Sequence, residues 1–546
     1  MNKKIILKIF VIAIFSILVL YIFSSFNIDK DNKKEYISLV AFGDNIDTET
    51  KPFVQGNGVY LSVDTISKLI DDNIYYDKLA TKVIVTKDDK IIKLKVDENK
   101  MYVNFEEKNI YTPAKYIESE AYVDIELLKD LYNLNVTYNK EKSIITIDKK
   151  EVENASTIKF NRVKVYSDIS TSSNVLQTLD DMDKVTVYEK SLVHSRWYKI
   201  KTSTGVVGYI AKNSVNVAST DDDKTQDTTN TQTQKINLSW QYVGNSNTTN
   251  CAKVEGVNVV SPTWFELKNS SGDITSKFNQ TYYNNAKNNG YKIWPIVTNG
   301  IDSVNYSSDD TSLFLKSESN REKFIKNLVG ICKKYKFEGI NMDFESLKVD
   351  DRSLYTQLIR EMAATFKAND LTLSVDLYFV EYMDRKNIGE VADYVCLMGY
   401  DQRGNWSVDD IGSIAEISWV DSKVNSLIND SDIDPQKIIL GVPFYTRVWN
   451  INNKTGDVKS SIYTMKDCVD FVDSHNLTTS FDEKSGQNYA EYTSGSITYK
   501  LWIEDATSMK SRLDIITKYK LAGIATWRKG LETDDIWNVI NENLNS

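Results

Sequence analysis

The sequence predicts an α/β protein built around a (β/α)8 barrel, and three observations lead to this fold class. The chain has 546 residues, which is too long for a single domain. After residue 235, eight apolar strand-like runs alternate with helical stretches, as expected for parallel strands joined by helices. Before residue 217, two regions of alternating apolar and polar residues predict a small α+β repeat domain and a small β barrel.

The composition argues against several classes of function. The net charge of −10 disfavours a nucleic-acid partner. The chain has two histidines, His194 and His475, and no His-Glu-x-x-His motif, which disfavours a multi-histidine zinc hydrolase. The four cysteines show no metal-binding spacing, so we expect buried apolar side chains and leave a disulfide open. No metal and no other cofactor is therefore expected.

Residues 1–27 predict a membrane signal anchor. Lysines flank the start of an apolar run from Ile9 to Phe26. The run is long for the core of a signal peptide, and no small-x-small cleavage site follows it. We expect an uncleaved anchor in the cell membrane, with the basic flank in the cytoplasm and the rest of the chain extracytoplasmic. A cleaved signal peptide, giving a secreted or cell-wall protein, is the alternative.

Residues 37–150 contain an internal repeat with an offset of 62 positions, since Tyr122-Val123 repeats Tyr60-Leu61 (122 − 60 = 62). Each copy predicts a strand, an amphipathic helix and a hairpin, and we expect the copies to pack together because each is too small alone. The pattern resembles the copper amine oxidase N-terminal-like domain. The region contains no histidine or cysteine, so the resemblance implies a binding or spacer module without copper.

Residues 156–217 predict a small β barrel of short strands separated by turn residues. The segments Tyr166–Asp168, Trp197–Ile200 and Gly208–Ile210 resemble the bacterial SH3-like domain, which implies binding to the cell wall. The aromatic residues in these segments can equally belong to the core. The following residues, 218–234, lack large apolar side chains and predict a flexible linker.

Residues 235–546 predict a TIM barrel, whose catalytic residues lie at the carboxyl ends of its strands. The stretch 448–496, between the seventh and eighth strands, is expected to form an inserted α+β subdomain that walls one side of a cleft. The predicted strands are 237–243, 257–265, 292–297, 339–345, 373–378, 394–400, 438–444 and 523–527. The predicted helices include 274–289, 319–335, 352–369, 411–429, 505–519 and 534–544.

The strand Gly339–Glu345 is the main functional lead. Asn341, Asp343 and Glu345 share one of its faces, where an inner parallel strand is normally apolar. Carboxylates two residues apart lie about 6–7 Å from each other along a strand, so one of them can hold a proton near neutral pH. Such a pair suits a general acid acting on a glycosidic oxygen. A structural carboxylate network or a metal ligand set is also compatible with the spacing.

The segment Glu338–Glu345 resembles the Asp-Gly-x-Asp-x-Asp-x-Glu signature of glycoside hydrolase family 18. The resemblance implies that Glu345 is the catalytic acid and base. It also implies that Asp343 orients and stabilises the acetamido group of the substrate. Glu338 and Asn341 depart from the signature, and the Asn-x-Asp-x-Glu form resembles the spore-wall and spore-germination branch of the family. The departure at Asn341 can alter how neighbouring groups balance the charge of Asp343.

Three further motifs resemble this family in the correct strand order. The segment Met398–Asp401 resembles a Met-x-Tyr-Asp motif, which implies that Tyr400 acts in catalysis by hydrogen bonding to the acetamido oxygen. The segment Gly441–Arg447 resembles the seventh strand, and Gly523–Trp527 ends in the tryptophan that floors the sugar site. The substrate-binding residues that the resemblance implies are Asn341, Met398, Asp401, Tyr445, Arg447 and Trp527.

The resemblance implies a retaining glycosidase that hydrolyses β-1,4 bonds of a glycan containing N-acetylglucosamine. In this substrate-assisted mechanism the 2-acetamido oxygen of the sugar is the nucleophile. The wall-type modules favour peptidoglycan or spore cortex as the polysaccharide substrate. A chitinase and a non-catalytic glycan-binding wall protein are the alternatives. Three tryptophans can serve either the core or the substrate site: Trp264, Trp294 and Trp502.

Overall fold

The computed structural model describes residues 34–109, 114–129, 131–150, 156–188, 196–217, 234–244, 250–300 and 308–544. They cluster into two compact units. The first lies within residues 1–76, 94–101 and 109–226, and the second within 77–93, 102–108 and 227–546. The predicted anchor and nearly all of the predicted linker fall outside the described residues. Among the helices that are described, none is long and apolar enough to cross a membrane.

The predicted repeat is visible in the first unit as two equivalent strands that pair with each other. Strands β5 (Gly58–Ser62) and β12 (Glu120–Asp124) run antiparallel, with Leu61 opposite Val123. A short helix follows each strand, α2 (Val63–Leu69) and α3 (Glu126–Lys129). The two sheets that lie wholly in this part of the chain have the orders β1-β4-β5-β12-β11 and β13-β14-β2-β3. The remaining strands of residues 35–149 are β1 (Glu35–Tyr36), β2 (Ser38–Ala41), β3 (Asp44–Ile46), β4 (Phe53–Gln55), β6 (Ile74–Asp77), β7 (Lys82–Lys87), β8 (Lys90–Lys95), β9 (Lys100–Val103), β10 (Glu106–Asn109), β11 (Ala114–Ile117), β13 (Leu134–Asn139) and β14 (Ile144–Lys149).

The next part of the first unit is all-β, as the alternating pattern predicts. Its seven strands form one sheet in the order β17-β16-β20-β19-β18-β15-β21. Ile158, Val165, Ile200 and Ile210 are among its fully buried core residues. The SH3-like resemblance itself stays a prediction. The elements are β15 (Ser156–Ile158), β16 (Val163–Tyr166), β17 (Val175–Leu179), β18 (Lys184–Tyr188), β19 (Trp197–Thr202), β20 (Val207–Ala211), the 3₁₀ helix η3 (Lys212–Ser214) and β21 (Val215–Asn216).

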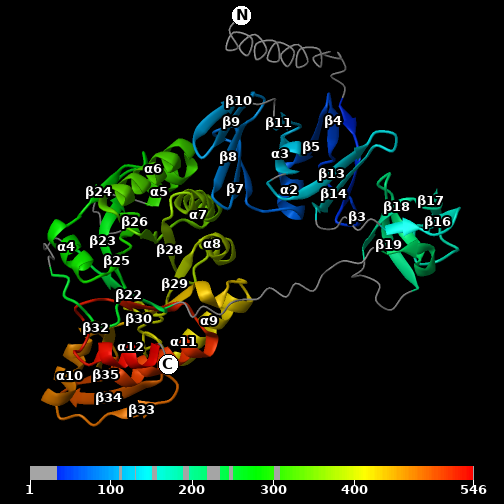
Figure 1. The fold of residues 1–546 in the computed structure, drawn as a ribbon. Helices are drawn as coiled ribbons and strands as arrows, with labels where there is room; N and C mark the ends of the chain where they lie inside the picture. The colour runs from blue at the N-terminus through cyan, green and yellow to red at the C-terminus, as the bar shows by residue number, and fades with distance from the viewer. Residues whose placement is uncertain are drawn as a thin grey trace, which may run out of the picture. The chain divides into compact units, whose positions relative to one another are not determined.

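The second unit contains the predicted TIM barrel. Its parallel strands follow one another around the ring in chain order, and β36 closes the ring by pairing with β22 (Figure 1). The third strand of the ring is split into β25 and β26, which both pair with β23. The barrel strands are β22 (Ile236–Gln241), β23 (Val259–Leu267), β25 (Lys292–Ile293), β26 (Ile296–Thr298), β27 (Gly339–Asp343), β28 (Thr372–Leu377), β29 (Tyr394–Met398), β30 (Ile438–Pro443) and β36 (Gly523–Trp527).

Helices cover the outside of the ring, and two predicted helices begin later than expected. Residues 274–276 form strand β24 (Ile274–Ser276), antiparallel to β23, because these residues pair with the end of a long neighbouring strand. The helix starts only after Asn279, whose side chain accepts a hydrogen bond from the Tyr282 amide at 2.9 Å and caps the helix. The predicted helix 411–429 begins at Ile417. The helices are α4 (Gln280–Asn288), α5 (Ser308–Lys316), α6 (Glu318–Tyr335), α7 (Arg352–Lys367), α8 (Arg385–Val391), α9 (Ile417–Asn429), α11 (Ala506–Tyr519) and α12 (Ile536–Leu544), with 3₁₀ helices η4 (Val349–Asp351) and η5 (Pro435–Lys437).

The inserted α+β subdomain is confirmed between the seventh and eighth barrel strands. One helix accompanies a five-stranded sheet of order β32-β31-β35-β34-β33, drawn in orange in Figure 1. All four cysteines of the chain are buried, as expected, and the structure shows each of them as a free thiol. The elements of the insertion are β31 (Tyr445–Asn452), β32 (Val458–Thr464), α10 (Met465–Ser474), β33 (Ser480–Asp482), β34 (Gln487–Ser494) and β35 (Ile497–Ile503).

Candidate active site

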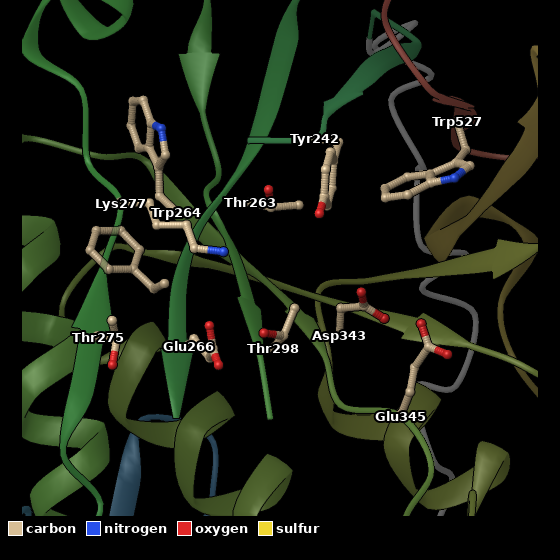
Figure 2. Close-up of a pocket in the computed structure, with 11 residues that line it drawn as sticks. Tyr242, Thr263, Trp264, Glu266, Thr275, Lys277, Thr298, Asp343, Glu345 and Trp527 are labelled. Carbon is tan, nitrogen blue, oxygen red and sulfur yellow. The ribbon is translucent and has the colours of Figure 1, made fainter. Parts of the chain in front are cut away.

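A cavity of about 340 Å³ lies among residues at or just beyond the carboxyl ends of five barrel strands (Figure 2). Of the predicted site residues, Asp343, Glu345 and Trp527 line it, so the structure brings together side chains from β27, the residues after it and β36. The other lining residues are Tyr242, Thr263, Trp264, Phe265, Glu266, Thr275, Lys277 and Thr298.

Strand β27 presents its acids to the cavity because its alternate residues hold the opposite face in the core. Ile340, Met342 and Phe344 are fully buried, and the Phe344 ring stacks on Tyr355 of α7 at a centroid distance of 5.8 Å. The strand ends at Asp343, two residues earlier than predicted, yet Glu345 still points into the cavity. In Figure 2 the carboxyl groups of Asp343 and Glu345 lie close together, on the side of the cavity where the Trp527 ring lies.

The backbone of Glu345 is held by a residue that the sequence analysis missed. The side-chain amide of Asn299, directly after β26, donates to the Glu345 carbonyl at 2.7 Å and accepts from the Glu345 amide at 3.1 Å. The next residue, Ser346, has a left-handed φ of 54°, and its amide donates to the Tyr382 hydroxyl at 3.0 Å. These bonds set the position of the carboxylate. A polar residue at the end of a predicted barrel strand was the available signal for Asn299.

Asn341 lies beneath the cavity and is fully buried. Its side-chain oxygen accepts from Trp240 Nε1 at 2.7 Å and from the Ser261 hydroxyl at 3.3 Å. Its Nδ2 donates to Asp376 Oδ1 at 2.7 Å. Asn341 is not among the residues that line the cavity, so direct contact with a substrate stays a prediction.

Asp376 on β28 is a second residue that the sequence analysis missed. It is buried inside the barrel, and burial raises the pKa of its carboxyl group to about 8. The charge of Glu345 raises this pKa further, whereas hydrogen bonds with Asn341 and Cys396 oppose the shift. The signal in the sequence was an aspartate in the middle of a predicted strand whose other residues are mostly apolar.

Tyr400, Asp401 and Tyr445 form a connected group between the carboxyl ends of β29 and β30. The Tyr445 hydroxyl donates to Asp401 Oδ1 at 2.7 Å, and the Tyr378 hydroxyl donates to the Asp401 carbonyl at 2.9 Å. Burial raises the pKa of Asp401, and the bond from Tyr445 and the charge of Arg447 oppose this shift. The rings of Tyr400 and Tyr445 lie edge to face, with their centroids 6.2 Å apart. The Tyr400 hydroxyl makes no hydrogen bond to another described residue. Tyr400, Asp401 and Tyr445 are not among the residues that line the cavity, so their contacts with a substrate stay predictions.

The two remaining predicted site residues lie beside this group. Arg447 on β31 donates from Nη1 to the Ser460 hydroxyl at 3.1 Å. Met398 ends β29 opposite Gly441 of β30. Neither is among the residues that line the cavity. Their contacts with a substrate stay predictions.

The wall of the cavity comes from a different element than expected. No residue of the insertion is among the lining residues, whereas the hairpin of β23 and β24 supplies Glu266, Thr275 and Lys277 at its end or just after it. This wall arises because β23 is nine residues long and continues beyond the ring. Trp264 and Trp294 are buried with 1% exposure, and Trp502 is half-buried and donates to Asp482 at 2.9 Å. The core interpretation therefore fits Trp294, and Trp264 belongs to both core and wall, whereas Trp502 is a partly exposed residue of the insertion outside the cavity lining.

One more aromatic residue on this side of the barrel was missed. Trp406, in the residues that follow β29, is 68% exposed. Arg403 in the same segment pairs with Glu416 at 3.1 Å and donates to the Ser413 carbonyl at 3.1 Å, which ties the two ends of the segment together. An exposed tryptophan on an ordered loop offers a face on which a sugar ring can stack.

Comparison with known protein families agrees with this geometry. The sequence profile of the glycosyl hydrolases family 18 matches residues 240–532, which is more than half of the chain. The profile of the copper amine oxidase N-terminal domain matches residues 40–147. Both resemblances that these regions suggest are confirmed.

Individual relatives match about half of this chain. The glycosylase YvbX of Bacillus subtilis is 24% identical over 269 residues, covering 47% of this chain and 76% of the relative. A cortical fragment-lytic enzyme of Bacillus anthracis is 26% identical over 274 residues, covering 47% of this chain and 62% of the relative. The crystal structure of the Bacillus cereus spore cortex-lytic enzyme SleL has a TM-score of 0.50 at 23% identity, covering 57% of this chain and 74% of that structure, and it shows the same fold. The chain therefore belongs to glycosyl hydrolase family 18 and is a glycosidase.

Proposed function

We propose that this glycosidase hydrolyses β-1,4 bonds next to N-acetylglucosamine in peptidoglycan or spore cortex, with retention of configuration. The observation that carries the proposal is the pair of carboxyl groups, Asp343 and Glu345, side by side in one cavity beside the Trp527 ring. Relatives that are named for lysis of cortical fragments support the choice of glycan.

The first step breaks the glycosidic bond without an enzyme nucleophile. The 2-acetamido oxygen of the sugar bonds to the anomeric carbon while Glu345 gives its proton to the leaving oxygen. The oxazolinium ion that forms is positively charged, and the Asp343 carboxylate stabilises it electrostatically. The Tyr400 hydroxyl, which has no hydrogen bond to another described residue, holds the acetamido oxygen in line.

The second step returns the enzyme to its starting state. Glu345, now ionised, takes a proton from a water molecule that attacks the anomeric carbon and opens the oxazolinium ring. Two inversions at the same carbon give retention. Trp527 supplies an apolar face for the sugar ring. Trp406, in the loop that follows the sixth barrel strand, offers a second face on which a sugar ring can stack.

One lysine lies in the cavity beside the acidic lining residues Glu266, Asp343 and Glu345, and it offers a binding partner for an acidic glycan that neutral chitin does not use. Lys277 points into the cavity in Figure 2, and its ammonium makes no hydrogen bond or ion pair to another described residue. The stem peptides of peptidoglycan, and lactyl groups that bear no peptide, carry carboxylates, whereas chitin carries none. The Lys277 ammonium can pair with such a carboxylate.

For the location of the enzyme, we propose an extracytoplasmic position next to the wall, with residues 1–27 as the membrane anchor. The SH3-like pattern of residues 156–217 supports attachment to the cell wall, because such a module would hold the enzyme at its insoluble substrate. The repeat domain would act as a binding or spacer module.

Replacing Glu345 by Gln removes the proton that the leaving oxygen needs. We expect kcat on purified peptidoglycan to fall by about 10²- to 10⁴-fold, measured as new reducing N-acetylglucosamine ends by mass spectrometry. The control is Glu381→Gln, an exposed carboxyl outside the cavity lining, which should behave as wild type. Unchanged turnover in Glu345→Gln would remove the mechanism. Cleavage of chitin oligomers alone would indicate a chitinase, and binding without cleavage would indicate a glycan-binding protein.

Replacing Asn299 by Ala removes both bonds that hold the backbone of Glu345. Misplacing a catalytic group by about 1 Å can cost about 10²-fold in rate, so we expect kcat to fall by about 10- to 100-fold while KM changes little. Asn289→Ala is the matched control, because Asn289 also donates to a backbone carbonyl, that of Cys251, at 2.7 Å. Steady-state kinetics of both variants test this prediction. An equal fall in kcat for Asn299→Ala and Asn289→Ala would show that loss of any such backbone bond lowers the rate, and would contradict a specific role of Asn299.

Replacing Lys277 by Met keeps the length of the side chain and removes its charge. We expect kcat/KM to fall by about tenfold on muropeptide oligomers, since a charge-assisted hydrogen bond contributes about 1.5–3 kcal/mol. Neutral N-acetylglucosamine oligomers should be cleaved as by wild type. Lys268→Met, on the same hairpin but outside the cavity lining, is the control. An equal loss on both substrates would contradict a role in reading carboxylates.

Cell fractionation tests the proposed location. The full chain should sediment with membranes and be accessible to protease added outside cells whose wall has been removed. A variant that lacks residues 1–27 should stay in the soluble fraction. Recovery of the full-length protein only from the soluble fraction would refute the anchor.

A further inference from the structure

Two acidic residues face the interior of the barrel at the same level on neighbouring strands. The register of β27 and β28 places Asn341 opposite Ser374 and Met342 opposite Val375. The next residues along the two strands are Asp343 and Asp376. Neighbouring strands lie about 4.8 Å apart, and paired residues point to the same face. The two carboxyl groups are thus neighbours inside the barrel, although 33 positions separate them in the sequence (376 − 343 = 33).

Asn341 fixes the orientation of Asp376. Trp240 Nε1 can only donate, so the atom of Asn341 that it contacts at 2.7 Å must be the side-chain oxygen. The NH₂ group of Asn341 therefore faces Asp376, and Asp376 Oδ1 accepts its hydrogen bond at 2.7 Å. With Oδ1 engaged, a proton on Asp376 belongs on Oδ2.

We propose that Asp376 is a positioning residue that shares one proton with Asp343, holding the Asp343 carboxylate in place for the acetamido group of the substrate. The inference rests on the proposed function, because it assigns a partner to the residue that stabilises the oxazolinium ion. No proton leaves the pair during the reaction: Asp376 keeps it and donates it as a hydrogen bond.

The surroundings of Asp376 favour the protonated form at neutral pH. Cys396 of β29 lies opposite Asp376 in the strand register. Tyr355 of α7 and Tyr400 are close enough for the charge of Asp376 to raise their pKa values, in addition to the effect of burial. The charge of Glu345 acts on Asp376, and Asp343 and Asp376 both raise the pKa values of Cys396 and Tyr400, which lie near the two carboxyl groups. Burial raises the pKa of Asp376 to about 8, and two adjacent carboxylates do not both ionise readily.

This arrangement explains how the site can work although Asn341 replaces the first barrel aspartate of the family signature. The strand β27 has an amide where the family signature has its first barrel aspartate, and an amide cannot exchange a proton with Asp343 near neutral pH. The carboxyl group that can do so comes from the adjacent strand instead, and Asn341 acts as the donor that orients it. The carboxyl group next to Asp343 thus comes from Asp376 on the adjacent strand β28 and not from position 341 of β27.

The pH dependence follows from the direction of the shift. The pKa of Asp376 is raised above its usual value near 4, so the shared proton is present below about pH 8 and is lost as the pH rises through that value. Above it the pair carries two negative charges, and Asp343 loses its hydrogen bond. The rate of hydrolysis should therefore fall on the alkaline side through loss of this proton.

The test compares wild type, Asp376→Asn and the exchange variant Asn341→Asp/Asp376→Asn. In Asp376→Asn the amide can still donate to Asp343 but has no proton to lose, so we expect kcat at pH 7 to stay within about tenfold of wild type. The part of the alkaline fall that comes from loss of the Asp376 proton near pH 8 should disappear, whereas the requirement for a proton on Glu345 stays. The exchange variant puts a carboxyl group back beside Asp343, and an alkaline limb should return. Asp350→Asn, at an exposed site, is the control and should keep the wild-type profile.

Infrared difference spectroscopy supplies a readout that does not depend on activity. Wild type should show the C=O stretch of a protonated carboxyl group that titrates near pH 8, apart from any band of buried Glu504, whose pKa burial raises to about 7, and Asp376→Asn should lack the band that titrates near pH 8. Persistence of this band in Asp376→Asn, or an unchanged pH–rate profile, would overturn the inference. If wild type cleaves no glycan but the band behaves as expected, the proposed function fails while the shared proton stands. Thermal unfolding checks that each variant is folded.

Discussion

The active end of this protein depends on how the barrel accommodates polar groups in its interior. A buried amide or carboxyl group is costly unless it is hydrogen-bonded. Asn341 meets this constraint by accepting from Trp240 and Ser261 on the first two strands and donating to Asp376 on the fifth. One side chain thus links four strands of the ring directly beneath the cavity, and each of its bonds restricts where the groups above it can lie.

The rigidity of the site follows from this interior and from the outer core. Ile340, Met342 and Phe344 are fully buried against the helices, so the strand cannot rotate to move its acids. The side chain of Asn299 then makes hydrogen bonds to both the carbonyl and the amide of Glu345, which lies beyond the end of the strand. A catalytic group that lies just past a strand is useful only if other residues hold it, and here the neighbouring strand does so.

Some structural features were predictable from local patterns and others were not. The alternation in residues 339–345 and the order of the apolar runs predicted the barrel and the two carboxyl groups in the cavity. The segment 274–276 was mistaken for helix because a short apolar and β-branched run is ambiguous on its own. It becomes a strand by pairing with Phe265–Leu267, and the resulting hairpin, not the insertion, walls the cavity.

The sequence by itself determined the fold class, the family and the two acids of β27, because strand alternation and a motif within eight residues are local properties. Only the tertiary structure decided the partners of those acids. Asn299 meets Glu345 from 46 positions away, and Asp376 meets Asn341 from 35 positions away. Parallel strands acquire their register through a long helical connection, so no local pattern specifies which side chains become neighbours across the ring.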